Sequence, residues 1–305
     1  MNVREWALVA FSILAQMSVG SFLVLGMVHY FAIRKAGMEE ADNLSDRALL
    51  AIGPVMILGL VASLLHLGNP MNAPRAVINL ATSWLSREVL FGTLFAGMGG
   101  LFAIMQWRKV GTFTVRNVIA WAAAILGLAM VYSMSRIYML ETQPVWDNLA
   151  TPISFFTTTV MLGLLAMGAA FMANYAFLKQ RDPSCADSIC DILRATLKWI
   201  AIASIVALGV EFVVIPVYLA SLTNSTIAAT AGQMLSGEFT AILVARLGLA
   251  FIGAGILGAF LYQTAQAPGK ENRLRNLAVS AFLLVFTAEV LGRFLFYATH
   301  IQIRI

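Results

Sequence analysis

The segment Trp199–Leu222 reads WIAIASIVALGVEFVVIPVYLASL and holds a single charged residue, Glu211. A helix needs about 20 consecutive apolar residues to cross the hydrocarbon core of a bilayer, and this segment is long enough. The whole chain has the same character, because 60% of its 305 residues are hydrophobic and only 11% are charged. Soluble domains carry about 25% charged residues. The composition therefore excludes a soluble globular enzyme and predicts a protein that crosses a membrane several times.

Seven further apolar runs have a similar length, so we expect an all-α bundle of eight transmembrane helices forming one integral membrane domain, residues 1–305. The polar stretches between the runs are too short for a soluble domain. Glycines at 97, 99 and 100 and at 253, 255 and 258 are expected to let helices pack closely. The expected spans are Ala7–Ile33, Ala48–Leu67, Glu88–Trp107, Asn117–Tyr138, Pro152–Leu178, Trp199–Leu222, Ala241–Gln263 and Leu277–Tyr297.

The distribution of Lys and Arg predicts the orientation. Of the 20 cations, 13 fall in the four loops that follow the first, third, fifth and seventh spans. Cytoplasmic loops carry the excess of positive charge, so we expect both termini on the periplasmic side of a bacterial inner membrane. The net charge of +5 is explained in this way without a nucleic-acid partner. The 13 residues are Arg34, Lys35, Arg47, Arg108, Lys109, Arg116, Lys179, Arg181, Arg194, Lys198, Lys270, Arg273 and Arg275.

The charged residues inside the expected spans lie in the periplasmic half or, for Glu211, near the midplane, and none lies in the cytoplasmic half. Such residues are costly in a bilayer and are candidates for function. A proton pump or an ion channel needs a polar path through both halves, so the charge-free cytoplasmic half argues against both. Two interpretations stay open for the deeper four: a network that locks three helices together, with Glu289 and Arg293 paired at i,i+4, or a functional site. The residues are Glu88, Arg136, Glu211, Arg246, Glu289 and Arg293, and Tyr297 and His300 continue the last stripe.

The loops on the periplasmic side hold more chemistry than a simple connection needs. Their residue types suit a quinone head group, whose two carbonyls accept hydrogen bonds and whose ring stacks on aromatic groups. A quinol loses two protons on oxidation, and a shielded carboxylate or an imidazole can accept them. We therefore predict Glu88 and His66 as proton acceptors. The predicted head-group contacts are Arg75, Arg136 and Tyr138, with Trp146 bordering the pocket.

Other cofactors fit the residues less well. A membrane haem usually needs two facing histidines, and only His66 and His300 could meet, both at helix ends, so no haem is expected. Cys185 and Cys190 are too few for an iron–sulfur cluster, which needs about four thiolates, and they fall in a cytoplasmic loop where free thiols are the rule. No metal is expected in this chain.

Several motifs of the chain, taken in order, resemble the membrane anchor subunit of dimethyl sulfoxide reductases. The resemblance covers essentially the whole chain, and the last run is its most specific piece. The motifs are His66-Leu-Gly-x-Pro70, Ser86-x-Glu88, Arg136-x-Tyr138, Pro144-x-Trp146, Thr151-Pro-x-x-Phe-Phe156 and Glu289-x-x-Gly-Arg293-x-x-Phe-Tyr297-x-x-His300.

This resemblance implies a subunit that carries no redox cofactor, binds menaquinol and serves anaerobic respiration. It would anchor an iron–sulfur subunit and a molybdopterin catalytic subunit in the lipid bilayer, and electrons from the quinol would pass to the iron–sulfur subunit. The family's proton-accepting carboxylate and histidine fall on Glu88 and His66. Arg87 is a departure, since relatives can carry a neutral residue there, and a cation beside Glu88 would favour the ionised carboxylate.

Three alternatives stay open. A transporter or channel would show interrupted helices at corresponding positions, for which Gly53-Pro54 and Pro216 are the candidates. An anchor of another molybdenum enzyme would run electrons into quinone instead. A purely structural anchor would leave the quinone site elsewhere in the complex.

Overall fold

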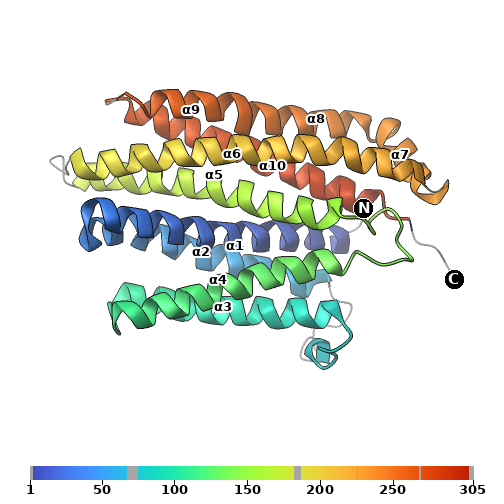
Figure 1. Cartoon of the computed structure of the whole chain (residues 1–305), viewed down its shortest axis with the longest axis horizontal. Coiled ribbons are helices and arrows are strands. Elements are labelled where there is room, and N and C mark those ends of the chain that lie inside the picture. Colours follow the sequence, from blue (N-terminus) through green and yellow to red (C-terminus); the bar gives the residue numbers. More distant parts are fainter. Residues whose placement is uncertain (1–2, 67–74, 182–186, 225, 268, 302–305) are drawn as a thin grey trace.

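The computed structural model describes residues 3–66, 75–181, 187–224, 226–267 and 269–301. Helices fill most of this part of the chain, which contains no strand, and the long ones run side by side along one axis (Figure 1). The elements are α1 (Val3–Ala36), α2 (Met38–His66), α3 (Trp84–Arg108), α4 (Phe113–Arg136), α5 (Ala150–Arg181), α6 (Asp187–Ser221), η2 (Leu222–Asn224), α7 (Thr226–Ser236), α8 (Thr240–Ala250), η3 (Phe251–Leu257), α9 (Gly258–Thr264) and α10 (Glu271–Ala298).

Seven described segments are long and apolar enough to cross a membrane, and each contains or closely matches an expected span. The remaining expected span, Ala48–Leu67, falls on α2. The described apolar part of this helix, Ile52–Leu65, is shorter than a full crossing. The seventh span is built from α8, η3 and α9 in continuous succession, and η3 is a π-helical stretch. Helices α2 and α6 continue through Pro54 and Pro216, so neither proline interrupts its helix as the transporter interpretation would require.

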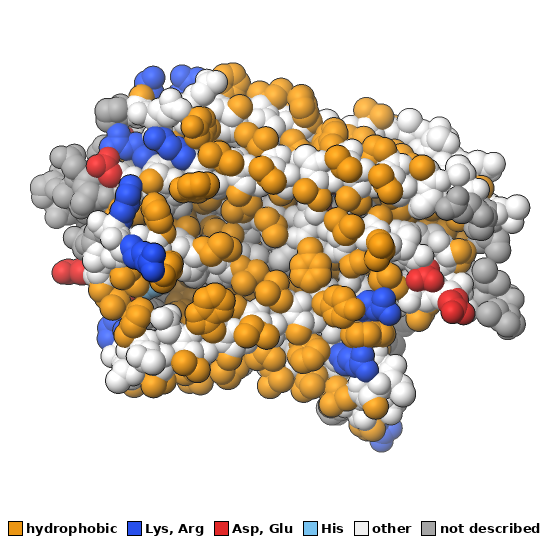
Figure 2. Space-filling model, in the orientation of Figure 1, with side chains coloured by type: hydrophobic (Ala, Val, Ile, Leu, Met, Phe, Trp, Pro, Cys, Tyr) orange, Lys and Arg blue, Asp and Glu red, His pale blue; other side chains and the backbone are white. Residues whose placement is uncertain are grey.

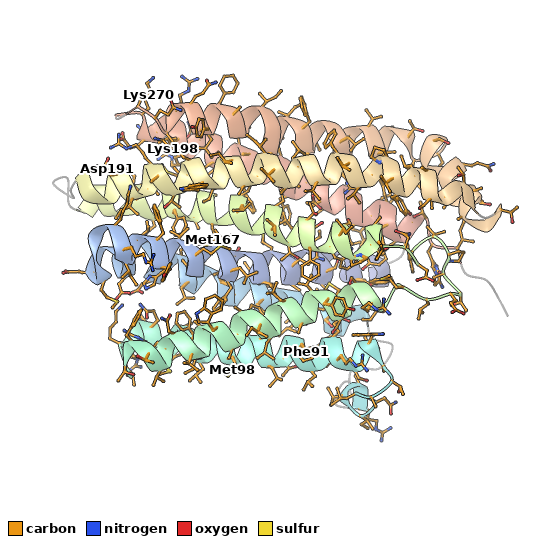
Figure 3. The ribbon with its side chains drawn as sticks, viewed as in Figure 1. Phe91, Met98, Met167, Asp191, Lys198 and Lys270 are labelled. Carbon is orange, nitrogen blue, oxygen red and sulfur yellow. The ribbon has the colours of Figure 1, made fainter. Side chains whose placement is uncertain are left out.

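The first and last helices meet at one end of the bundle. Helix α1 begins and α10 ends there, and the rings of Trp6 and Phe294 stack with centroids 5.7 Å apart (Figure 1). We call this the terminal end. The opposite end carries Lys198 and Lys270, labelled in Figure 3, together with other cations of the expected cytoplasmic loops. We call it the basic end.

Apolar side chains cover the sides of the bundle between these two ends. Figure 2 shows hydrophobic groups along the length of one face, with the blue Lys and Arg side chains concentrated toward the ends. Large residues such as Trp121 on α4 and Val213 on α6 are more than 60% exposed on these sides. Such exposure is unfavourable in water and favourable in lipid, so the surface fits a bilayer.

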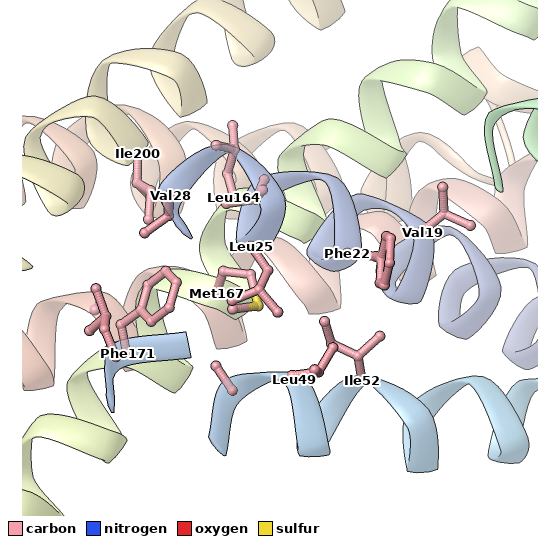
Figure 4. Packing of buried hydrophobic residues seen from close by; sticks show 14 of the residues in the cluster. Val19, Phe22, Leu25, Val28, Leu49, Ile52, Leu164, Met167, Phe171 and Ile200 are labelled. Carbon is pink, nitrogen blue, oxygen red and sulfur yellow. The ribbon is translucent and has the colours of Figure 1, made fainter. Parts of the chain in front are cut away.

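The core is centred on α1 and α5, the most buried of the spans. Side chains of α1, α2, α5 and α6 interdigitate there, and Figure 4 shows Leu25 on α1 packed close to Met167 on α5. The two helices touch through glycine, since a Cβ on Gly20 would lie 1.9 Å from the Thr159 carbonyl oxygen. The expected close packing through Gly97, Gly99 and Gly100 was wrong, because nothing lies within 4 Å of a Cβ built at those positions.

Candidate functional site

An aromatic cluster occupies the terminal end of the bundle. Tyr138 and Trp146 lie in the segment between α4 and α5, and both contact the last turn of α10. The Tyr138 ring centroid is 5.2 Å from that of Trp146 and 5.1 Å from that of Phe296. The two residues that the sequence predicted around the head group are therefore brought together, and α10 supplies the other wall.

Tyr138 is hydrogen-bonded to a second tyrosine. Its hydroxyl oxygen lies 2.8 Å from that of Tyr297 on α10. Burial raises the pKa of Tyr138 well above its usual value, and the nearby Tyr297 and Glu88 add to the effect. The phenol therefore stays protonated at physiological pH and remains a hydrogen-bond donor.

Trp146 is 7% exposed and closes the end of α10. Its indole Nε1 donates to the Phe296 carbonyl oxygen at 3.0 Å. The indole stacks on both Phe296 and His300, with centroids 4.9 and 4.8 Å away. The expected border residue is thus also a structural residue, since it satisfies a carbonyl that the end of a helix leaves without an intrahelical partner.

Glu88 lies in the second turn of α3 and is only 6% exposed. Within the part of the chain that the structure describes, its carboxylate has neither a hydrogen-bond partner nor an ion pair. It is close enough to Tyr138 and Tyr297 for its charge to act on both. A shielded carboxylate therefore lies within electrostatic range of a pair of tyrosine hydroxyls.

The neighbouring Arg87 is hydrogen-bonded to the segment that precedes α3 and does not form an ion pair with Glu88. Its Nε donates to the Leu80 carbonyl oxygen at 2.8 Å and its Nη2 to the Ala81 carbonyl oxygen at 2.7 Å. The guanidinium also lies 4.2 Å from the ring centroid of Trp84. Arg87, where relatives can carry a neutral residue, therefore holds the segment before α3 in place. Its expected effect on the ionisation of Glu88 finds no support in these contacts.

Arg136 is the last residue of α4 and also lies near Trp84. Its guanidinium carbon is 5.4 Å from the Trp84 ring centroid, and its Nη1 makes a weak contact of 3.6 Å with the Met139 sulfur. Its Nε is buried and has no partner among the described residues. Arg136 therefore keeps donor capacity at the terminal end, as a head-group contact requires.

The structure does not bring every predicted residue into the cluster. Arg75 is exposed in a short 3₁₀ turn at 75–77, ahead of α3. His66 is the last residue of α2, and its side chain lies outside the described residues, as does the segment 67–74 that follows it. Its proposed role as a proton acceptor therefore stays a prediction.

A second group of charges lies deeper in the same half of the bundle. Arg246 donates through Nη2 to the Glu211 carboxylate at 2.5 Å, as the network interpretation predicted. The i,i+4 pair on α10 does not form directly. Glu289 instead accepts a 2.7 Å hydrogen bond from the Thr158 hydroxyl, and Arg293 donates to the Gln16 side chain at 2.9 Å.

Arg293 also joins this group to the aromatic cluster. Its guanidinium carbon lies 3.8 Å from the ring centroid of Phe155, which in turn contacts Tyr138 with centroids 5.8 Å apart. Sequence reasoning missed Gln16, Thr158 and Phe155 as partners, because each is an ordinary residue on a helix distant in the chain. Across the described ranges, no group of three His, Cys, Asp or Glu side chains could hold a metal ion.

The fold and the site define a class: a helical membrane protein whose buried polar and aromatic residues gather at one end of the bundle. A sequence profile described as DMSO reductase anchor subunit (DmsC) matches residues 1–299. The chain therefore belongs to the DMSO reductase anchor subunit family, which implies the membrane anchor of a molybdoenzyme complex with catalytic and electron-transfer partner subunits. It is a multi-pass protein of the bacterial inner membrane.

Curated relatives agree with this assignment. The protein is 27% identical to the DmsC-type component of anaerobic dimethyl sulfoxide reductase from Escherichia coli (strain K12), over 98% of its own length and 96% of the relative. It is 28% identical to the YnfH component of anaerobic dimethyl sulfoxide reductase of the same strain, with the same coverage. A shorter similarity, 32% identity over 30% of this protein and 29% of the relative, is to a subunit of the sulfite dehydrogenase of Allochromatium vinosum.

Proposed function

We propose that this subunit binds menaquinol at the terminal end of the bundle and oxidises it, passing two electrons to an iron–sulfur partner subunit. That partner would deliver them to a molybdopterin catalytic subunit in anaerobic respiration. The observation that carries the proposal is the shielded Glu88 carboxylate within electrostatic range of the hydrogen-bonded hydroxyls of Tyr138 and Tyr297. A quinol needs a donor for its oxygens and an acceptor for its protons, and this arrangement offers both.

The residues take distinct roles in the proposed site. Quinol oxidation releases two electrons and two protons per ring. Glu88 takes up a proton from a ring hydroxyl, with His66 as the second acceptor. Tyr138 and Arg136 hold the ring oxygens, because the Tyr138 phenol stays protonated and the Arg136 Nε has no partner among the described residues. Arg75, which lies outside the cluster, would have to reach the head group from the 3₁₀ turn.

The proposed orientation of the bundle in the membrane rests on the distribution of its Lys and Arg residues. We infer that α2 completes an eighth crossing, that the whole chain forms one membrane domain and that the terminal end faces the periplasm. The cations near the basic end support this, since cytoplasmic loops are the positive ones (Figure 3). Protons from the quinol would then leave on the periplasmic side.

The test is Glu88→Gln in the assembled complex, which keeps the size of the side chain and removes its basicity. We expect quinol-driven turnover to fall by about 100-fold or more, the usual contribution of a positioned base. Turnover driven by an artificial dye that reduces the iron–sulfur subunit directly should not change. Glu141→Gln is a matched control, because Glu141 is exposed on the segment between α4 and α5. Unchanged quinol turnover in Glu88→Gln would remove Glu88 from the mechanism.

A second candidate reverses the electron flow. The similarity to the sulfite dehydrogenase subunit over part of the chain favours an anchor that runs electrons into quinone. The same pocket would then give protons to a quinone. Assays of the purified complex with reduced and with oxidised quinone, each with its substrate, decide between the two directions.

A further inference from the structure

A cavity lies between α5, α6, α7, α8 and α10, and Phe296 of the aromatic cluster forms part of its wall. Its lining runs from Glu289 on α10 to Thr299, the residue that follows this helix, and on α6 from Glu211 to Leu219. Ten residues of helix span about 15 Å. The lining also reaches Ala150 and Thr151, where α5 begins at the terminal end. The cavity therefore extends from the buried charges toward the terminal surface.

The deep part of the cavity holds charged atoms without partners. Glu211 is 6% exposed and Arg293 is 4% exposed. Glu211 Oε2, Arg246 Nε and Arg293 Nε are buried and have no hydrogen bond to any described residue. Buried polar atoms almost always have partners, from the protein or from ordered water. Donors and an acceptor are both left over here, so the missing partner must accept from guanidinium and donate to carboxylate.

The size of the cavity matches water. Its volume is about 80 Å³. A bound water needs about 10–15 Å³ of such space, so the cavity has room for roughly five to eight molecules. A chain of hydrogen-bonded waters about 2.8 Å apart needs about five to cover 15 Å. The volume and the length are therefore both compatible with a short chain of hydrogen-bonded waters.

The two carboxylates at the base of this cavity differ in their partners. Glu211 is tied to Arg246 by an ion pair. Glu289 receives a hydrogen bond from the neutral Thr158 hydroxyl, while Glu211, Arg246 and Arg293 face it from α6, α8 and its own helix without a direct bond. Glu289 is thus the carboxylate that can gain or lose a proton without breaking an ion pair.

We propose that this cavity is filled with water and lets Glu289 exchange protons with the solution at the terminal end. The charge of Glu289 acts on Arg293, and Arg293 acts on Tyr138 and Tyr297. The protonation of Glu289 therefore changes the electrostatic potential at the proposed quinol pocket. This last step rests on the proposed quinol oxidation, whereas the water content of the cavity does not.

The first experiment is a cryo-electron microscopy map of the assembled complex at a resolution that shows ordered water. We expect water within hydrogen-bonding distance of Glu211 Oε2, Arg246 Nε and Arg293 Nε. Ser154→Leu should displace part of this water, because Ser154 lines the cavity, and Ile153→Leu is its control on the exposed face of the same helix. A dry cavity, or one occupied by a lipid, would overturn the proposal.

The second experiment measures the pH profile of quinol-driven turnover in Glu289→Gln, which keeps an oxygen to accept the Thr158 hydrogen bond. We expect the midpoint to move by about one pH unit, since one charge beside Arg293 no longer titrates. Dye-driven turnover should not change, and Glu238→Gln, an exposed residue before α8, should keep the original profile.

The outcomes separate the two proposals. If Glu88→Gln abolishes quinol turnover but Glu289→Gln leaves the pH profile unchanged, the quinol function stands and proton exchange at Glu289 is wrong. If Glu88→Gln has no effect while the map shows water in the cavity, the water-filled cavity stands and the proposed quinol chemistry is wrong.

Discussion

The side chain of Arg246 lies directly against the backbone of Gly292. A Cβ on Gly292 would sit 2.5 Å from the Arg246 Nε and 2.7 Å from its Cζ, closer than side-chain contacts allow. Arg246 thus crosses the face of α10 at a position where only glycine leaves room, and from there it reaches Glu211.

Gly292→Ala should destabilise the protein although helix propensity points the other way. Alanine in place of glycine inside a helix normally stabilises by about 1 kcal/mol. Here the methyl group pushes Arg246 away from Glu211, and breaking a buried ion pair typically costs about 3–5 kcal/mol. Thermal unfolding of the assembled complex should show a lower midpoint. Gly248→Ala on α8 is the control, since nothing lies within 4 Å of its Cβ, and an equal midpoint shift in both variants would contradict this account.

Gly163→Ala should prevent α1 and α5 from packing. A Cβ on Gly163 would lie 2.2 Å from the Gly20 carbonyl carbon, a backbone atom that cannot move aside. Gly168→Ala on the same helix should be tolerated, because its Cβ meets the Ile200 side chain at an ordinary 3.5 Å. The yield of assembled complex from membranes measures the difference, and normal assembly of Gly163→Ala would contradict the close crossing.

Tyr138→Phe and Tyr297→Phe remove the same hydroxyl–hydroxyl bond but should differ in quinol binding. Tyr138 is the proposed head-group contact, so its loss should raise KM for quinol by about tenfold, the usual weight of one hydrogen bond. Tyr297 only positions Tyr138, so its loss should have a smaller effect on KM. Steady-state kinetics with a soluble quinol analogue tests this order. The reverse order would make Tyr297 the contact.

Lys109 should tie α3 to the start of α2 over the whole physiological pH range. Its Nζ lies 2.6 Å from an Asp42 oxygen and 2.8 Å from an Asp46 oxygen. Burial lowers the pKa of Lys109, but the two carboxylates outweigh it and leave the pKa raised. A cation with a raised pKa stabilises the fold below its unfolded value of about 10.4, and this contribution is lost only as pH rises through the folded value.

Lys109→Gly should therefore lower the unfolding midpoint at neutral pH. The difference in midpoint between the variant and the unmodified protein should become smaller in strongly alkaline solution. Glycine is the apt replacement, because Lys109 has a positive φ of 52° and glycine adopts it without strain. The side chain is 46% exposed, so each ion pair contributes at most about 1 kcal/mol. A gap that does not depend on pH would show that the ion pairs contribute nothing.

The helical spans could be predicted from the sequence because one property, apolar length, decides them. Helix α7 could not, since Thr226–Ser236 has only 11 residues and is too short to stand out as an apolar span. The glycines on α3 were misjudged because spacing along a helix does not tell whether a face meets a neighbouring helix or lipid. Gly20 and Gly163 lie on different helices, so their contact could not be predicted from the spacing within either helix.

The candidate site was predictable residue by residue but not as an arrangement. Tyr138 and Trp146 could be selected by type, yet their partner Tyr297 lies 159 positions from Tyr138. The i,i+4 spacing of Glu289 and Arg293 suggested a pair, but side chains from other helices compete for the same atoms. Thr158 and Gln16 take those atoms, and no local pattern reveals that.

The π-helical stretch η3 sets the phase between the two halves of its span. A π-helical turn holds about one residue more than an α-helical turn, so a regular α-helix over Phe251–Leu257 would rotate everything before it relative to everything after it. Arg246 would then point away from Glu211 while Leu261 kept its place in the core. Gly253 in this stretch lies against α10. The wider turn thus sets a fixed rotation between the two halves of the span, which a regular helix of the same length could not provide.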